Sequence, residues 1–294
     1  MSTSETRRPR AYEATEALAH VDALDGVADT ISGWVRRAVP RGPLKDGLSG
    51  SWLGHALHPM LTDVPIGLWT SALTLDWLGG RDAQGAADRL IALGLGATVP
   101  TVAAGLSDWA DSTVGSEAVK RVGLVHAASN VVATTLFTGS YLARRRGSRG
   151  TGKLLALAAG GALGFGGFLG GHLSFAQGIG VDQTAFEEPT GEWHDALDDA
   201  ELADGEPQAV EVDGVAVMLV RERGEVFALS DRCAHRGGPL HEGTLEDGCV
   251  RCPWHGSLFR LRDGSLEGGP SAYPQPAWDT RTEGGRIQVR PVTA

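Results

Sequence analysis

Apolar and polar positions repeat along this chain in three ways, and each way predicts a different kind of structure. Over residues 15–38, apolar side chains recur at steps of three and four with aspartates between them, which is the period of an amphipathic helix that lies on a membrane surface or on the protein itself. Between residues 55 and 181, long apolar runs replace this alternation. From residue 208 onward, polar and apolar positions alternate as in strands that bury one face.

The apolar region contains four segments that are candidates for membrane-spanning helices. The three later segments carry no charged side chain over 18, 22 and 28 residues, namely 90–107, 122–143 and 154–181. The first, roughly 57–78, is weaker because Asp63 and Asp76 bracket only 12 uncharged residues. Since a spanning helix needs about 20 apolar residues, the pattern predicts a four-helix transmembrane bundle. A soluble four-helix bundle is the alternative, but soluble helices carry a charged face and the last two segments have none.

The C-terminal stretch has the pattern of a compact antiparallel β domain. The segment AVEVDGVAVMLVRERGEVFALS alternates and turns at Asp213-Gly214 and Arg223-Gly224. Before it, residues 182–206 hold ten acidic side chains and no lysine or arginine. The predicted fold class is therefore two-domain α + β. Its expected parts are an N-terminal tail with an amphipathic helix (1–50), a four-helix membrane domain (51–181), an acidic linker (182–191) and a β domain (192–294).

Composition and charge narrow the function classes. The net charge is −10, and no nucleic-acid partner is expected because phosphate contacts need a basic face. All three cysteines, Cys233, Cys249 and Cys252, lie within twenty residues, so they serve one local site rather than a disulfide framework. Arg7 and Arg8 resemble the start of a twin-arginine export signal, but no apolar stretch follows them, which favours a basic tail.

The strongest chemical signal is a pair of short loops that each offer one cysteine and one histidine. The pattern is Cys233-x-His235, then sixteen residues, then Cys252-x-x-His255. A structural zinc site with two cysteines and two histidines is one interpretation, although such sites usually pair like ligands on separate arms. Mixed arms suit a cofactor with two unlike ends, such as a [2Fe–2S] cluster in which one iron takes two cysteines and the other two histidines.

These loops resemble those of the Rieske iron–sulfur family. The matching stretches are CAHRGGPL at 233–240, CPWHGSLF at 252–259 and the proline-rich GGPSAYPQPAW at 268–278, and the resemblance extends over about 192–292. The resemblance implies that Cys233 and Cys252 hold the inner iron, and that His235 and His255 hold the outer iron through their Nδ1 atoms. It also implies that Ser257 donates a hydrogen bond to a bridging sulfide, and that 268–278 covers the cluster.

Departures from the family's subtypes predict a low potential. High-potential members carry an extra cysteine in each loop and a tyrosine two residues after the serine, whereas this chain has Gly238, Trp254 and Phe259 there. With fewer donors to the sulfurs we expect a midpoint near about −150 mV, at the low end of the Rieske range. Cys249 is outside the pattern and is expected to be a buried strand thiol.

The predicted function is that of a membrane-anchored carrier of single electrons. The alternative is a ferredoxin-like component of a separate oxygenase system, with the helices only as an anchor. A complete oxygenase active site is not expected, because the 39 residues after His255 contain no histidine for a mononuclear iron.

Histidines in the apolar region form a second candidate site. They are His55, His58, His126 and His172. If four helices span, all of them lie toward the membrane face at which the β domain emerges. They ligate a b-type haem or bind a quinone in one interpretation, and are interfacial histidines bonded to helix ends in the other. Through His58-Pro59 and Gly171-His172, residues 50–180 also resemble a family of four-span bacterial membrane domains without assigned function.

The expected location is the bacterial inner membrane, crossed several times by the chain. The expected partners are a redox partner protein or a quinone, and the membrane itself. Basic residues lie both before the first span and between the last two, so they do not fix the orientation. We expect the cluster domain on the cytoplasmic side, because folded iron–sulfur domains that are exported need the signal that is missing here.

Overall fold

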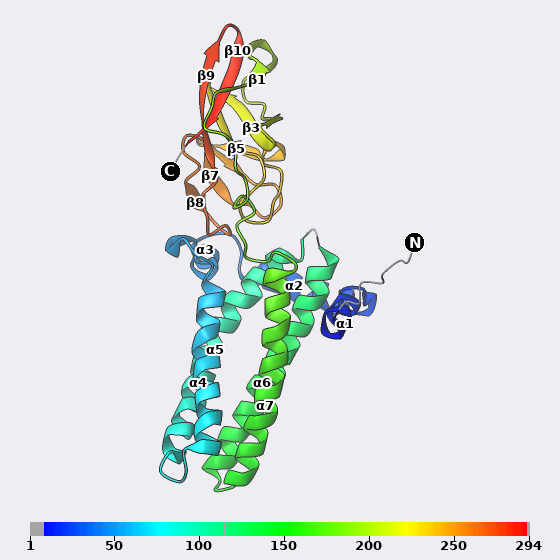
Figure 1. The fold of residues 1–294 in the computed structure, drawn as a ribbon, viewed down its shortest axis with the longest axis vertical. Helices are drawn as coiled ribbons and strands as arrows, with labels where there is room; N and C mark the ends of the chain where they lie inside the picture. Colours follow the sequence, from blue (N-terminus) through cyan, green and yellow to red (C-terminus); the bar gives the residue numbers. More distant parts are fainter. Residues whose placement is uncertain (1–8, 115, 293–294) are drawn as a thin grey trace, which may run out of the picture. The chain divides into compact units, whose positions relative to one another are not determined.

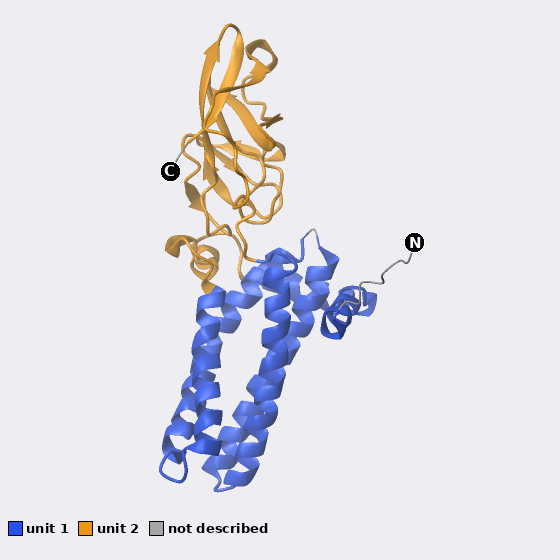
Figure 2. Cartoon of the chain, in the orientation of Figure 1, with its two compact units in different colours: residues 1–38, 58–179 blue, residues 39–57, 180–294 orange. Residues whose placement is uncertain are grey.

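The chain divides into two compact units. The computed structural model describes residues 9–114 and 116–292, so Arg7 and Arg8 lie outside the described residues. The helical unit comprises residues 1–38 and 58–179, and the β unit comprises residues 39–57 and 180–294 (Figures 1 and 2). The β unit thus draws on two stretches of chain that lie on either side of the long helices in the sequence.

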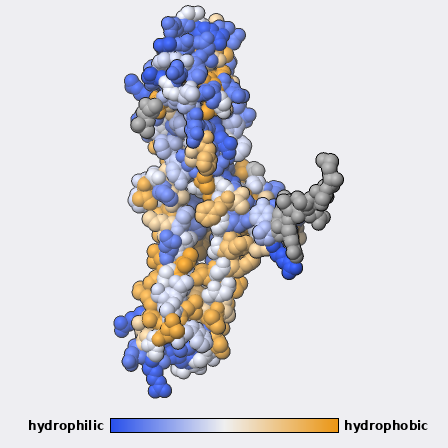
Figure 3. Space-filling view, viewed as in Figure 1, coloured by the Kyte–Doolittle hydropathy of each residue, from blue (hydrophilic) through white to orange (hydrophobic). Residues whose placement is uncertain are grey.

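The helical unit is built from four long helices. They are α4 (Leu57–Leu78), α5 (Gln84–Ser112), α6 (Glu117–Arg145) and α7 (Arg149–Phe175). Three of them, α5 to α7, are long and apolar enough to cross a membrane, whereas α4 does not reach that level. Figure 3 shows hydrophobic residues gathered over these helices. Outward side chains such as Val99 (70 % exposed) and Val131 (63 %) suit contact with lipid tails.

The helices pack closely where glycines face aromatic rings. The Trp69 ring of α4 stacks on Phe137 of α6 with 4.2 Å between ring centroids. On its other side it meets Gly94 of α5, where an added Cβ would lie 2.3 Å from the Trp69 Nε1 atom. A larger residue at position 94 would therefore push α4 and α5 apart, which is the reason small residues recur between such helices.

Buried charges join all four helices at the end where α4 stops and α5 begins. Arg144 of α6 is fully buried and binds both carboxylate oxygens of Asp76 on α4. It also reaches Asp88 of α5 at 3.1 Å, and Arg149 of α7 binds the same carboxylate at 3.0 Å. We call these four residues the Arg144 cluster. Because every member has an opposite charge beside it, the cluster is compensated within the protein.

The amphipathic segment near the N-terminus lies on the protein. It forms α1 (Arg10–Ala19) and α2 (Asp25–Ala38). The buried face of α2 carries the small side chains Ala28, Ser32 and Val35. Asp25 binds Arg121 of α6 at 2.7 and 2.8 Å, and Asp29 binds Lys120 at 2.9 Å. Of the two predicted locations of this helix, a membrane surface or the protein itself, these ion pairs favour the second.

The β unit contains two antiparallel sheets. The larger has the order β1-β10-β9-β4-β3-β2 and the smaller has the order β5-β6-β7-β8. The strands are β1 (His194–Asp198), β2 (Gln208–Val212), β3 (Val215–Glu222), β4 (Glu225–Ser230), β5 (Thr244–Glu246), β6 (Cys249–Arg251), β7 (Leu258–Arg260), β8 (Leu266–Gly268), β9 (Ala277–Glu283) and β10 (Arg286–Pro291). The predicted antiparallel β domain is confirmed.

Both predicted turns join strands as hairpins. Asp213 and Gly214 lie between β2 and β3 with φ of 51° and 77°, and Arg223 and Gly224 lie between β3 and β4 with φ of 54° and 80°. Two successive positive φ angles make the tight turn whose twist matches a hairpin. A hydrophobic core that includes Met218, Leu229 and Phe259 also contains Cys233 and Cys252, so the two candidate ligands are anchored in the packed interior.

Candidate metal centre

The two Cys/His loops are built alike. In the loop after β4, Gly237 N donates to Cys233 O at 2.7 Å and Cys233 N donates to Gly238 O at 2.9 Å. In the loop between β6 and β7, Gly256 N donates to Cys252 O at 3.0 Å and Cys252 N to Ser257 O at 2.9 Å. Gly237 and Gly256 have φ of 74° and 82°, a conformation that favours glycine. Each loop therefore folds locally, from residues adjacent in the sequence.

The two thiols lie together and are surrounded by backbone N–H groups. Cys233 and Cys252 are buried and hydrogen-bonded to each other. That bond and the N–H groups of Trp254, His255 and Gly256 lower the pKa of Cys252 to about 7, despite burial. The same thiol pairing, together with burial, raises the pKa of Cys233. Donors aimed at sulfur stabilise a thiolate, which is the form that binds metal.

The two imidazoles lie together as well. The ring centroids of His235 and His255 are 5.0 Å apart at an interplanar angle of 82°. Burial, followed by the charge of His255, holds the pKa of His235 well below its usual range, so this imidazole stays neutral. Within the described part of the chain, Nδ1 of His235 is buried and has no hydrogen-bond partner. A neutral imidazole with an unused buried nitrogen is suited to bind a metal.

This arrangement fits a cofactor with two unlike ends. Residues 9–114 and 116–292 contain no point on which three His, Cys, Asp or Glu side chains converge, as a single zinc ion would require. Instead the thiols form one pair and the imidazoles another. A [2Fe–2S] cluster with two cysteines on one iron and two histidines on the other matches that division.

Ser257 and Gln275 join the loops around this site. Ser257 is fully buried, and its Oγ accepts from Ser271 N at 3.0 Å, which leaves its own proton to donate. Gln275 accepts from Ala234 N at 2.9 Å, and its amide donates to Ser230 O at 2.7 Å and Arg232 O at 2.9 Å.

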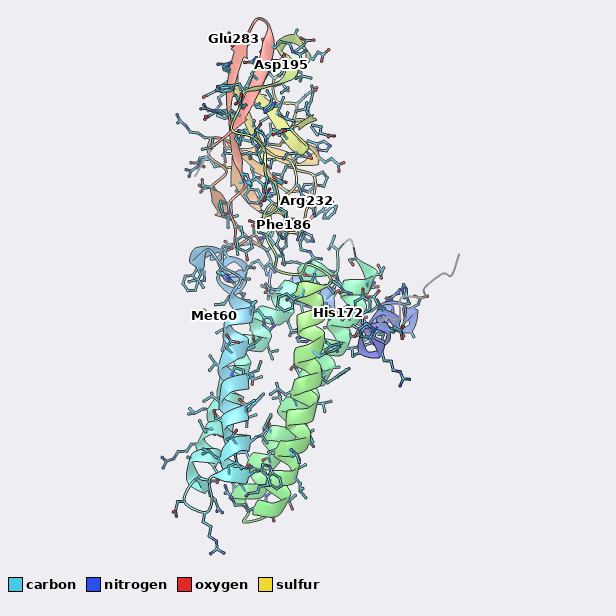
Figure 4. The ribbon with its side chains drawn as sticks, viewed as in Figure 1. Met60, His172, Phe186, Asp195, Arg232 and Glu283 are labelled. Atoms are coloured by element: carbon cyan, nitrogen blue, oxygen red, sulfur yellow. The ribbon has the colours of Figure 1, made fainter. Side chains whose placement is uncertain are left out.

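Sequence reasoning missed Gln275. Its signal was present, because it is the only long polar side chain within GGPSAYPQPAW. Its bonds to Ala234 N and Arg232 O connect the stretch 268–278 to the Cys/His loop after β4. Arg232 is labelled in Figure 4.

The positions that hold extra cysteines in high-potential relatives are filled differently here. A Cβ added to Gly238 would lie 3.0 Å from the Trp254 ring and 3.1 Å from Cys252 Sγ. The tryptophan therefore packs where a disulfide would cross. Cys249 is buried within β6, where burial raises the pKa of its thiol.

The predicted membrane histidines fall into three different settings. His58 and His126 each direct Nδ1 at a backbone carbonyl, Thr101 O at 3.0 Å and Gly166 O at 2.8 Å. Because a carbonyl only accepts, Nδ1 carries the proton in both rings and Nε2 carries the lone pair. The Nε2 atom of His126 lies 3.3 Å from the Asn130 amide.

The other two histidines have neighbours of their own. His172, in the last turn of α7 (Figure 4), faces α1, with Nε2 at 3.4 Å from Glu16 and 5.6 Å between the ring centroids of His172 and Tyr12. His55 belongs to the β unit, where its ring meets the Tyr273 ring edge-on at 6.3 Å. His58 and His126 thus make the same kind of bond to a helix backbone, whereas His55 and His172 each pack against different side chains.

Two family models match the chain. The model described as Rieske [2Fe–2S] domain matches residues 192–279, and the one described as predicted membrane protein (DUF2231) matches residues 54–183. The resemblance of both regions is therefore confirmed, including their fusion in one chain.

Individual relatives align with the β domain. The ferredoxin subunit of anthranilate 1,2-dioxygenase from Burkholderia cepacia is 33 % identical over 103 residues, which is 35 % of this chain and 95 % of that subunit. Apoptosis-inducing factor 3 of Homo sapiens is 38 % identical over 90 residues, and the match spans only 15 % of that protein. The solved ferredoxin of carbazole 1,9a-dioxygenase from Nocardioides aromaticivorans is 31 % identical, with a TM-score of 0.33, over 34 % of this chain and 98 % of that one.

Proposed function

Because the chain belongs to the Rieske [2Fe–2S] family, we propose that it is a membrane-anchored protein that carries single electrons. The observation that supports this best is the division of the site into a buried thiol pair and a pair of adjacent imidazoles. When bound, a cluster of this type takes up and gives up one electron at a time. No substrate needs to bind at the site for that role.

The proposed ligands are Cys233 and Cys252 for the inner iron and His235 and His255 for the outer iron. The backbone N–H groups at Cys252 stabilise negative charge on its sulfur, and the unused Nδ1 of His235 supports ligation through that atom. Ser257 holds its proton free to donate because its oxygen is fixed by Ser271 N. We propose that this proton points to a bridging sulfide.

A low potential is part of the proposal. Trp254 and Gly238 take the place of the disulfide, and Phe259 offers no hydroxyl donor, so the reduced state receives less stabilisation. Electron paramagnetic resonance of the reduced, purified protein should give a Rieske-type signal. Its redox titration should give a midpoint potential of about −150 mV. A colourless protein with bound zinc, or a midpoint above about +200 mV, would contradict the assignment.

The membrane part is proposed to cross the bilayer four times, with α4 as the first crossing. The Arg144 cluster supports this, because Arg144 neutralises Asp76 within α4. As parts of the sequence we propose a tail (1–50), a membrane domain (51–181), an acidic linker (182–191) and a cluster domain (192–294), with residues 39–57 packed in the β unit.

We place the cluster on the cytoplasmic side of a bacterial inner membrane. Glu206 is exposed, so Glu206→Cys offers a labelling site near the linker. In intact cells an impermeant thiol reagent should leave this cysteine unlabelled until the membrane is permeabilised. Labelling of intact cells would put the cluster outside.

Two kinds of partner fit the proposed role. One is a quinone or a membrane redox protein. The other is a separate oxygenase, with the helices only as an anchor, and the similarity to a dioxygenase ferredoxin subunit supports it. Quinone or haem in the purified protein would favour the first, and reduction of a soluble oxygenase by the purified protein would favour the second.

His58 and His126 support a haem or quinone site as a second proposal. Both rings donate Nδ1–H to a carbonyl, as metal-ligating histidines commonly do, and carry the lone pair on Nε2, which at His126 faces the Asn130 amide. His55 and His172 are less suited, because each packs against other side chains. A reduced-minus-oxidised spectrum without a haem band, together with quinone-free lipid extracts, would remove this proposal and leave the two rings as helix-packing groups.

A further inference from the structure

The segment 39–57 packs with the β unit although it precedes the long helices in the sequence. It contains α3 (Pro43–Ser49) and a short turn at Ser51–Leu53, and we call it the strap. Its bond between Asp46 and Gly269 joins residues 223 positions apart. In Figure 2 the strap has the colour of the β unit. The sequence pattern divided it between the N-terminal tail (1–50) and the membrane domain (51–181).

The strap contacts the stretch 268–278, which is proposed to cover the cluster site, at its beginning and at its middle. At the beginning, Gly269 N donates to Asp46 Oδ1 at 2.9 Å. A Cβ added to Gly269 would lie 2.4 Å from Ser51 Oγ, so the strap and this stretch are in close contact. At the middle, the His55 ring meets the Tyr273 ring edge-on. The strap therefore contacts residues 269–273 at two points.

The strap also carries positive charge to the cluster loops. The guanidinium of Arg41 lies over Gly256, where an added Cβ would be 2.5 Å from Arg41 Cζ. Lys45 lies in α3 of the strap, directly before Asp46, whose carboxylate accepts from Gly269 N. Lys45 is buried, at 5 % exposure, so its charge is little screened by water.

We propose that the strap is a working part of the cluster site, in which Asp46 positions the covering stretch and Arg41 and Lys45 make the cluster easier to reduce. This rests on the proposed function, since it presumes a cluster between the two loops. One-electron reduction adds a negative charge to the site. A nearby cation favours the more negative state, and a buried cation favours it most. Lys45 and Arg41 thus act on the cluster through their charge and do not ligate its irons.

The charge effect is tested by redox titration of the full-length protein. Lys45→Gln should lower the midpoint potential, and Arg41→Gln should lower it less because Arg41 is exposed. Lys45→Arg, which keeps the charge, should restore the wild-type midpoint. Arg262→Gln removes the same charge from an exposed site of the β unit and should leave the midpoint unchanged.

The positioning effect needs a separate readout. Asp46→Ala removes the acceptor of Gly269 N and should speed the loss of iron to a chelator, whereas Asp46→Asn keeps an acceptor oxygen and should lose iron at nearly the wild-type rate. If Lys45→Gln assembles no cluster, Arg41→Gln carries the charge test, with Arg262→Gln as its control.

The outcomes separate this inference from the proposed function. An intact Rieske signal with unchanged midpoints in Lys45→Gln and Arg41→Gln, or a wild-type iron-loss rate in Asp46→Ala, overturns the role of the strap. Absence of the signal in the wild-type protein overturns the proposed function instead.

Discussion

The two units treat their buried polar side chains in opposite ways. In the helical unit, Arg144 and Asp76 are both buried, and each is bound by an opposite charge from another helix. In the β unit, the thiols of Cys233 and Cys252 bind each other and backbone N–H groups, and Nδ1 of His235 has no partner among the described residues. Polar groups that are satisfied by protein therefore hold a fold together, whereas buried donors and acceptors left unused indicate a place for a cofactor.

The units also differ in how their polar sites are assembled. Each cluster loop closes on itself within a few residues, so its spacing is visible in the sequence. The Arg144 cluster draws on four helices, with 68 positions between Asp76 and Arg144. The Cys/His loops can therefore be recognised from one sequence. The Arg144 cluster becomes visible only in the folded structure.

The largest expected effect is the loss of bound iron when a thiol of the β unit is removed. Cys252→Ser should lose nearly all bound iron and the visible absorbance, because a serine hydroxyl does not ionise near pH 7 as the Cys252 thiol does. Cys249→Ser is the matched control, since Cys249 lies in β6 outside the loops, and it should retain both. Iron analysis and absorbance measure the result. Full iron content in Cys252→Ser would show that the thiol pair is not the inner end of the site.

The next largest effect is on the stability of the helical unit, when a charge of the Arg144 cluster is removed. Arg144→Leu leaves the Asp76 carboxylate buried without its cation, which should destabilise the helical unit by about 3–5 kcal/mol. Thermal unfolding in detergent measures it, and Arg146→Leu, an exposed neighbour, should change little.

Removal of both partners sharpens this test. The double variant Asp76→Leu with Arg144→Leu should be less destabilised than either single variant, because no buried charge is left alone. A double variant as unstable as the sum of both singles would mean that packing rather than charge compensation holds this end of the helices.

A smaller effect is expected from the residue that sequence reasoning missed. Gln275→Ala leaves Ala234 N, Ser230 O and Arg232 O without their partner, and each is at or near the buried site. The loss should cost about 1–3 kcal/mol of unfolding free energy and speed iron release. Denaturant unfolding followed by cluster absorbance checks both. Gln288→Ala, whose bonds lie at the surface, serves as the control and should match wild type.

The smallest effect concerns the attachment of α2. The hydrogen bond from Arg121 holds the pKa of Asp25 below its ordinary value of 3.8. A lowered folded-state pKa means that this contribution is present above the ordinary value and is lost as the pH falls through the folded one. Asp25→Asn should therefore loosen α2 slightly at neutral pH, as acid would.

Proteolysis reports the loosening of α2. We expect cleavage between α1 and α2 to be faster in Asp25→Asn at pH 7, and the difference from wild type to shrink in acid. If wild type and Asp25→Asn were cleaved at equal rates at pH 7, Asp25 would not contribute to the attachment of α2.

The sequence predicts features that depend on neighbouring residues and fails where distant ones decide. The Asp213-Gly214 and Arg223-Gly224 hairpins and the ligand spacing are local, and they were predictable. The amphipathic helix had two predicted resting places, and only its ion pairs with Lys120 and Arg121, more than 90 positions away, decide between them. Gln275 binds residues 41 to 45 positions away, and Asp46 of the strap binds one 223 positions away, so local spacing does not predict these contacts.

The strap has a consequence for the path of the chain through the bilayer. A chain that crosses an odd number of times leaves its two ends on opposite sides. Residues 39–57 and 180–294 form one unit, so the stretch between them must leave and return on the same side. The three helices that meet the length and apolarity criteria give an odd count, and α4 restores an even one. If α5 to α7 all cross the bilayer, we therefore expect α4 to cross as well, because three crossings would leave the strap and the two Cys/His loops on opposite sides.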